Sequence, residues 1–196
     1  MKKMIAAVAV AAFVFAPQAF AQAKNFEGFS VGVNADWVNA TSGYTSTSGA
    51  VTESVSDSSL NLGIQAQYNI AMGQQFVLGL GAMYELTKSK AGTYASGTAI
   101  KAKNNYTVFI APGYAISNTT LIYGKVSSIG TTSECEGCTD TTFSGYGVGV
   151  GFQSLLDKNW YLQGEAMANK YDDKVGNGAT NNAKTTILSF GVGYKF

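Results

Sequence analysis

Arginine and histidine are absent from this chain of 196 residues, and all 13 of its basic residues are lysines. Bidentate recognition of phosphate depends on the arginine guanidinium, so a nucleic-acid groove has little to build on, especially with a formal net charge of +1. A serine nucleophile most often needs a histidine base, and none is present. Catalysis by carboxylates alone would fall to the loop acids Glu134, Glu136, Asp140, Asp172 and Asp173, which we expect to be merely solvated. We therefore predict no enzymatic activity, no cofactor, no metal site and no nucleic-acid partner.

Charge and proline are also scarce, since only 13% of the residues are charged and there are 2 prolines. Soluble domains carry about 25% charged residues, so this chain has few charges for a surface that faces water. Glycine is abundant, with 23 residues, and 46% of the chain is hydrophobic. No linker rich in proline or charge divides the sequence, which predicts a single domain.

The two cysteines, Cys135 and Cys138, form the sequence CEGC. A redox motif would place the first cysteine at a helix N-terminus, and a zinc site would need further cysteine or histidine ligands that the chain does not have. A disulfide that closes a tight turn is the interpretation that we favour, and it fits an oxidising compartment.

The N-terminus begins with Lys2 and Lys3, continues with an apolar run over residues 4–16 and reaches the small-residue pattern Ala-Phe-Ala at 19–21. This order is typical of a secretory signal peptide. The apolar run is short for a membrane span of about 20 residues, which favours removal over anchoring. We predict cleavage after residue 21, or alternatively after residue 23, which leaves a mature domain over residues 24–196.

No segment of the mature chain shows a sustained helical period, but alternation with a period of two recurs along it. Apolar residues at even positions from Leu60 to Ile70 alternate with amides and glycine, which predicts one strand with two chemically opposite faces. Eight such segments are present: 28–38, 59–70, 76–86, 105–116, 121–129, 142–153, 160–171 and 185–196.

The connections between these segments alternate strictly in length. Three are short turns, over 71–75, 117–120 and 154–159. Four are long and polar: 39–57, 87–104, 130–141 and 172–184. Such an order predicts an all-β fold, an eight-stranded antiparallel up-and-down barrel with every long loop at one end.

Two classes of barrel share this alternation, because a soluble lipocalin-like carrier turns its apolar face inward and a membrane barrel turns it toward lipid. Glycine and amide residues on the other face suit a crowded interior. Aromatic residues lie near strand ends, where interfacial girdles belong, and each strand is close to the 9 to 11 residues of a tilted transmembrane strand. The sequence therefore favours a transmembrane barrel.

Charged residues within the strands can be placed by energetic cost. A lysine at the lipid-facing midplane costs roughly 2 to 4 kcal/mol, so Lys125 should point into the lumen, and so should Glu85 and Glu165. With Asp36 they form a predicted lumen cluster whose members pair with one another, because an unpaired buried charge is expensive.

The glycine-alternating strands YGVGVGF at 146–152 and SFGVGYKF at 189–196, together with the signal peptide and the loop pattern, resemble the small outer-membrane barrels of Gram-negative bacteria. These include the transmembrane domain of outer membrane protein A and the opacity-type outer membrane β-barrel domain. The resemblance spans 27–196. It implies location in the outer membrane, contact with its lipid and lipopolysaccharide, and a terminal signal for the barrel-assembly machinery at Phe190, Val192, Tyr194 and Phe196.

The function expected from these features is structural or adhesive, with four polar loops held outside the cell on a rigid scaffold. The loop at 39–57, with its serine and threonine run and Tyr44, is the best candidate for an extracellular ligand. A narrow pore for ions or small solutes is the alternative, followed by a periplasmic lipocalin-like carrier. Side chains fill most of an eight-stranded lumen, so charges there are expected to plug it.

Overall fold

The structure of this protein is a computed structural model that describes residues 22–46, 52–93, 97, 99–135, 140–176 and 179–196. One short 3₁₀ helix, η1 (Gln22–Phe26), precedes the strands. The strands are β1 (Gly28–Ser46), β2 (Thr52–Met72), β3 (Phe76–Glu85), β4 (Ser89–Thr93), β5 (Ala99–Ala115), β6 (Thr120–Cys135), β7 (Thr141–Leu155), β8 (Trp160–Tyr171), β9 (Lys174–Gly176) and β10 (Ala179–Lys195).

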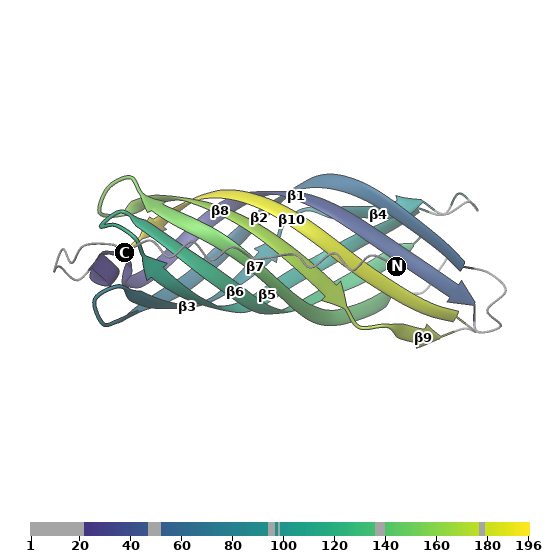
Figure 1. Cartoon of the computed structure of the whole chain (residues 1–196). Helices are drawn as coiled ribbons and strands as arrows, with labels where there is room; N and C mark the ends of the chain where they lie inside the picture. The colour runs from purple at the N-terminus through teal and green to yellow at the C-terminus, as the bar shows by residue number, and fades with distance from the viewer. Residues whose placement is uncertain (1–21, 47–51, 94–96, 98, 136–139, 177–178) are drawn as a thin grey trace, which may run out of the picture.

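Eight of these strands close into a ring in the order β1-β2-β3-β5-β6-β7-β8-β10, and β10 pairs with β1 to complete it. Every pairing is antiparallel between strands that follow one another around the ring, which confirms the predicted up-and-down barrel (Figure 1). The short strands β4 and β9 pair with β5 and β10 outside the ring path. None of the helices in the described part of the chain is long and apolar enough to span a membrane.

The barrel has two different ends. The tight turns that join β2 to β3, β5 to β6 and β7 to β8 lie at one end together with η1 and the C-terminus, and we call this the short-turn end (Figure 1). The other end, which we call the long-loop end, carries β4 and β9. The connections predicted to be long therefore all lie at one end of the barrel, and the predicted short turns lie at the other.

The predicted strand bounds were wrong at the long-loop end. The strand predicted at 28–38 continues to Ser46, and its partner begins at Thr52 rather than at 59. β5, β6 and β10 are extended in the same way, and the short strands β4 and β9 occupy parts of predicted loops. The missed parts of β1, β2, β6 and β10 are rich in serine, threonine and asparagine, so they lack the apolar alternation that marks a strand in lipid.

The outer and inner faces of the barrel differ in chemistry as the period of two requires. Val33, Leu62 and Val150 point outward and are 55%, 54% and 65% exposed, whereas Asp36, Asn61 and Lys125 point inward and are 0%, 0% and 3% exposed. An apolar exterior and a polar interior are the arrangement of a membrane barrel.

Strand β5 contains a bulge between Lys103 and Tyr106, opposite Thr131 of β6. Asn104 takes the left-handed conformation there, with φ 54°, which asparagine tolerates better than most residues. A bulge inserts one extra residue, so Lys103 and Tyr106 share the outer face although three positions separate them. The adjacent Asn105 points inward and reaches the carboxylate of Glu85.

The helix η1 was not predicted, and it lies against the short-turn end of the lumen. Ala23 and Phe26 are completely buried. The backbone N–H of Ala23 donates to the carbonyl of Gln74 over 3.0 Å, and the Asn69 amide donates to the carbonyl of Phe26 over 3.1 Å. These contacts make η1 a plug at this end of the barrel.

Candidate functional site: the charged lumen and its chamber

The half of the lumen next to the short turns, which we call the packed half, is filled with side chains. Phe109, Tyr123 and Tyr161 are 3%, 9% and 3% exposed and join one buried cluster with Phe26 of η1. Glycine on neighbouring strands leaves room for them, because a Cβ at Gly151 would lie 2.6 Å from the ring of Tyr123. Large side chains opposite glycine thus close this half of the barrel.

A chain of amides runs through the packed half and connects its two ends. The amide of Gln65 donates to Gln163 over 3.3 Å and to Gln67 over 3.2 Å. Gln67 in turn donates to Asn69, which holds the carbonyl of Phe26. Because buried amides are costly unless they are paired, this network fixes the positions of the side chains that fill the lumen.

The four charged residues predicted for the lumen all point into it, and we call them the charged lumen layer: Asp36 of β1, Glu85 of β3, Lys125 of β6 and Glu165 of β8. They line a cavity of about 40 Å³ at mid-barrel. Their pairing is unequal, since only two of the four form an ion pair with each other.

Lys125 and Glu165 are that pair, and both are almost fully buried. The same carboxylate oxygen of Glu165 accepts hydrogen bonds from the Tyr123 hydroxyl over 2.6 Å and from the Gln163 amide over 3.1 Å. The ammonium of Lys125 also lies 3.9 Å from the centre of the Phe109 ring, within the range of a cation–π contact. These contacts compensate the loss of hydration on both sides of the pair.

Glu85 is held differently, by neutral donors. Its Oε2 atom accepts hydrogen bonds from the amides of Asn61 and Asn105, each over 2.7 Å, and from the hydroxyl of Ser89 over 3.1 Å. Among the described residues, no salt bridge involves Glu85. The prediction that the four charges pair with one another is therefore met in the structure by Lys125 and Glu165 only.

Asp36 is the most isolated member of the layer. It is 0% exposed, and within the described chain neither of its carboxylate oxygens has a hydrogen bond of good geometry, although Ser189 faces it across the β1–β10 ladder. With all four groups ionised, three carboxylates face one ammonium. In that state the layer carries a negative charge that the side chains of the lumen do not neutralise.

The half of the lumen next to the long loops contains a chamber of about 500 Å³. Its walls include small or apolar residues that point inward, among them Val38, Ala40 and Ile187, and the aromatic residues Phe143 and Tyr171. Glu85 and Asn105 of the charged region lie at its base and also line the small mid-barrel cavity. The chamber has the size of a small-molecule site and joins apolar walls to one carboxylate.

The outer rim of the long-loop end carries exposed ion pairs. Glu134 accepts from Lys88 over 2.6 Å and from Lys103 over 3.3 Å, and Lys103 also pairs with Asp140 over 2.9 Å. The hydrogen bonds from Lys88 and Lys103 hold the pKa of the Glu134 carboxyl below its ordinary value. Asp140, followed by Glu134, raises the pKa of Lys103.

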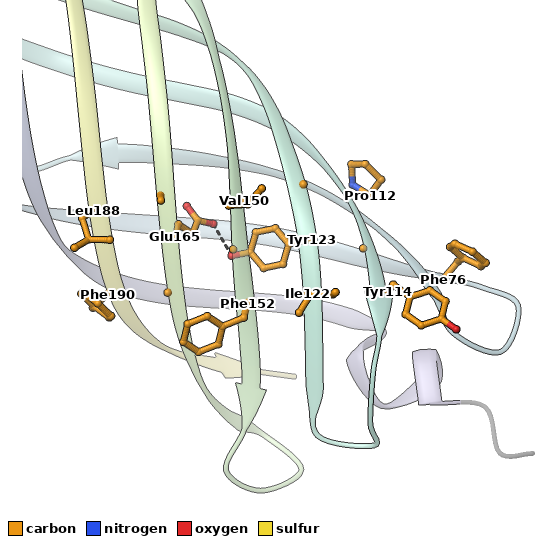
Figure 2. A pocket seen from close by; sticks show the side chains of 15 residues that line it. Phe76, Pro112, Tyr114, Ile122, Tyr123, Val150, Phe152, Glu165, Leu188 and Phe190 are labelled. Atoms are coloured by element: carbon orange, nitrogen blue, oxygen red, sulfur yellow. Dashed lines mark hydrogen bonds between the residues drawn. The ribbon is translucent and has the colours of Figure 1, made fainter. Parts of the chain in front are cut away.

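A groove of about 800 Å³ runs over the outer, apolar face near the short turns. Figure 2 shows Phe152, Ile122 and Phe190 among the residues that line it, with the hydrogen bond from Tyr123 to Glu165 beside them. Gly124 and Gly164 keep the surface low between the larger side chains. Because the groove belongs to the apolar outer face, acyl chains of the surrounding lipid are sufficient to fill it.

The C-terminal residues of the predicted assembly signal lie on the outer face. Phe190, Val192 and Phe196 are 59%, 36% and 70% exposed. The ring of Phe196 packs 5.1 Å from that of Tyr194 and 5.9 Å from that of Phe29, measured between ring centroids. Cys138 lies outside the described residues, so the predicted disulfide with Cys135 stays a prediction.

The family described as "Outer membrane protein beta-barrel domain" matches residues 6–196 of the chain. This chain belongs to that family. The barrel therefore lies in the outer membrane of a Gram-negative bacterium, with the short-turn end in the periplasm and the long-loop end outside the cell. Among curated proteins, no relative matches it.

Solved structures of similar fold have low sequence identity to this outer-membrane barrel. Neisserial surface protein A (NspA) has a TM-score of 0.55 and 20% identity, over 87% of this chain and 98% of the other. Ail, the attachment invasion locus protein of Yersinia pestis, in complex with the heparin analogue sucrose octasulfate, gives 0.52 and 14%, over 87% and 99%. The outer membrane protease OmpT of Escherichia coli gives 0.52 and 10%, over 86% and 97%.

These three structures share only the fold with the outer-membrane barrel, since all are below 25% identity. A surface protein, an attachment protein and a protease occur on the same architecture, so the fold leaves the activity open. No group of three acidic, histidine or cysteine side chains within the described residues is arranged to hold a metal ion.

Sequence reasoning missed the neutral partners of the charged lumen layer. Asn61, Asn105 and Ser89 hold Glu85, and Tyr123 and Gln163 hold Glu165. Gln163 lies two positions from Glu165 on the same strand face, which the period of two could have indicated. Ser89 lies in a segment predicted as a loop, so no sequence signal pointed to it.

Proposed function

We propose that this outer-membrane barrel is a non-enzymatic surface protein whose rigid extracellular rim contacts other molecules or cells. The observation that carries the proposal is the extension of the paired strands beyond Trp37. β1 stays paired with β2 up to Thr45 and Thr52, and with β10 up to Ser46 and Ala179. Residues 39–46 and 52–57 of the predicted ligand-binding loop are thereby the paired strands of a hairpin.

Polar side chains cover the outer face of this hairpin. The amide of Asn39 donates to the Ser58 hydroxyl over 3.2 Å, and the hydroxyls of Thr41 and Ser56 are hydrogen-bonded over 2.9 Å. Tyr44, in the same segment of β1, has the inward parity of Val38 and Ala40 and lines the chamber. A face of hydroxyl and amide groups held on paired strands suits contact with a polar surface such as a glycan or another protein.

The acids of the rim support a role without catalysis. Glu134 and Asp140 are engaged by lysines, and Asp172 accepts a hydrogen bond from the Ser144 hydroxyl over 3.2 Å. Glu136 lies outside the described residues. Glu134, Asp140 and Asp172 therefore have surface partners. The chain contains no histidine that could act as the base of a nucleophile.

The proposal includes two partners in the outer membrane, lipopolysaccharide and the barrel-assembly machinery. Lys170 and Lys184 are exposed cross-strand neighbours, and Tyr146 lies opposite Lys170 on the other side. Like charges in that arrangement repel unless an anion lies between them, which suits a phosphate of lipopolysaccharide. The alternation of exposed apolar residues in β10, among them Phe190 and Val192, supports recognition by the barrel-assembly machinery.

A narrow pore is the second candidate. The packed half of the lumen, with its amide network and the Lys125–Glu165 pair, speaks against conduction because large side chains fill the path. A planar-bilayer recording tests this: the proposal expects no sustained conductance, and a stable ion-selective current would favour the pore.

The surface role is tested by changing the outer face of the hairpin. In a Thr41→Glu/Ser56→Glu variant, adhesion of expressing bacteria to cultured cells and to immobilised glycans should fall several-fold. A matched control with acids on the periplasmic turn, Ser117→Glu/Thr119→Glu, should adhere like the wild type. Equal adhesion of all three strains at equal surface expression would refute the role of the rim.

A further inference from the structure

The extracellular chamber has a volume of about 500 Å³, and its wall is mainly apolar. Val38 and Ala40 are 2% and 5% exposed, and they form its wall together with Phe143, Tyr171 and Ile187. Inward-facing small residues on β1 leave the space open, whereas tyrosines fill the equivalent space in the packed half. A ligand for this wall needs an apolar body.

The base of the chamber provides the polar anchor. Three neutral donors hold Oε2 of Glu85, from Asn61, Asn105 and Ser89. The other oxygen, Oε1, has no hydrogen bond or salt bridge within the described chain and is not one of its buried unsatisfied atoms. Glu85 itself lines the chamber. A carboxylate that is fixed through one oxygen and open at the other is preorganised to accept a donor from a ligand.

The negative charge at the base of the chamber favours a donor that is itself a cation. Lys125 is engaged by Glu165, which leaves Glu85 and the fully buried, unpartnered Asp36 without a cation in the lumen. Lys184 also borders the chamber, but it lies on the outer face of β10, where it is exposed opposite Lys170. The base of the chamber therefore carries uncompensated negative charge at low dielectric, where a cation is bound more strongly than in water.

We propose that this chamber binds a small organic cation, in which an ammonium group meets Glu85 and an apolar body lies against Phe143, Tyr171 and Ile187. Aromatic walls favour such a ligand further, because a cation is attracted to a ring face. A volume of about 500 Å³ accommodates a molecule of this kind. The chamber lies on the inner side of the same β1 segment whose outer face carries the proposed surface role.

The test uses the purified full-length mature barrel in detergent micelles with two probes of the same shape, 4-phenylbutylammonium and the neutral 4-phenylbutanol. Titration is followed by isothermal calorimetry and by NMR shifts of the backbone amides of Tyr171 and Ile187. Wild-type protein should bind the ammonium saturably at one site, and the alcohol at least tenfold more weakly.

Glu85→Gln keeps the shape of the side chain and should weaken ammonium binding about tenfold while leaving alcohol binding unchanged. Glu134→Gln is the matched control, since this acid lies on the outer rim, and it should bind both probes like the wild type. Ala40→Phe fills the chamber and should weaken both probes. Heat-dependent gel mobility reports that each variant is folded.

Equal ammonium affinity in Glu85→Gln and the wild type would overturn the proposal. So would unsaturable uptake of both probes that Ala40→Phe does not reduce, because that behaviour describes partition into the micelle. A loss of binding in Glu134→Gln equal to that in Glu85→Gln would place the cation at the rim and would overturn it as well.

Discussion

The packed periplasmic half of the lumen and the open extracellular half are enclosed by the same eight strands with the same alternation of faces. In the packed half, Phe109, Tyr123 and Tyr161 point inward opposite glycine, and helix η1 closes the end. In the open half, residues such as Val38 and Ala40 point inward, and a chamber of about 500 Å³ remains. The number of strands sets the width of the barrel, but side-chain size decides whether the lumen is a core or a cavity.

The charged lumen layer lies between the two halves and follows the same division. Glu165, the ion-pair partner of Lys125, accepts hydrogen bonds from Tyr123 and Gln163 of the packed half. Glu85 faces the chamber, and Asp36 lies beside the small cavity at mid-barrel. The following predictions change one half at a time.

Breaking the buried ion pair should have the largest effect. Lys125→Met leaves Glu165 without its cation in the packed half, which costs about 3 to 5 kcal/mol of unfolding free energy. Equilibrium unfolding in urea from lipid vesicles measures this loss. The double variant Lys125→Met/Glu165→Gln removes both charges and should recover most of it; a double variant no more stable than the single one would show that packing, and not the charge, is responsible.

Replacing one buried alanine in each half by phenylalanine should show that the packed half has no free space and that the open half does. Ala111 is 4% exposed in the packed half, and Ala40 is 5% exposed at the chamber wall. Ala111→Phe should lower the unfolding free energy by about 1 to 3 kcal/mol because it overpacks a filled core. Ala40→Phe enters open space and should cost less than about 1 kcal/mol. Equal losses in the same unfolding assay would mean that the chamber collapses in the membrane.

Neutralising Asp36 should raise the stability of the barrel, whereas breaking the Lys125–Glu165 pair lowers it. Asp36→Asn replaces a buried carboxylate without good hydrogen bonds by a neutral group of the same shape, so stability should rise by about 1 kcal/mol. Glu165→Gln, the matched change in the packed half, should destabilise the barrel. A marked loss of stability in Asp36→Asn would reveal a cation or solvent network that this carboxylate holds.

The rim ion pairs should have the smallest effect because they are exposed to solvent. Lys88 and Lys103 hold the pKa of Glu134 below its ordinary value, so the stabilisation that they provide is present at pH values above the unfolded carboxyl pKa of about 4.3 and is lost as the pH falls through the lower folded pKa. An NMR titration of the Glu134 carboxyl should show this lowered midpoint, and Lys88→Gln should move it upward. An unchanged midpoint would mean that Lys103 alone sets it.

The sequence allowed the membrane-facing strands and the placement of Lys125 and Glu165 to be predicted, because lipid imposes a strict alternation and a high cost on charge. The predicted bounds of β1, β2 and β10 at the long-loop end were wrong, since hydroxyl-rich segments pair as strands there without any apolar signal. It also did not predict η1, which is too short to show a helical period and is fixed by contacts with Gln74 and Asn69.

The sequence by itself determined the class of fold and its membrane environment, because both follow from local alternation and from the lengths of the connections. The tertiary structure alone decided which acid is paired and which is left open. Lys125, Glu165, Glu85 and Asp36 come from four different strands, and their distances depend on the stagger with which the barrel closes. For the same reason only the closed barrel shows that one half of the lumen is filled and the other contains a chamber.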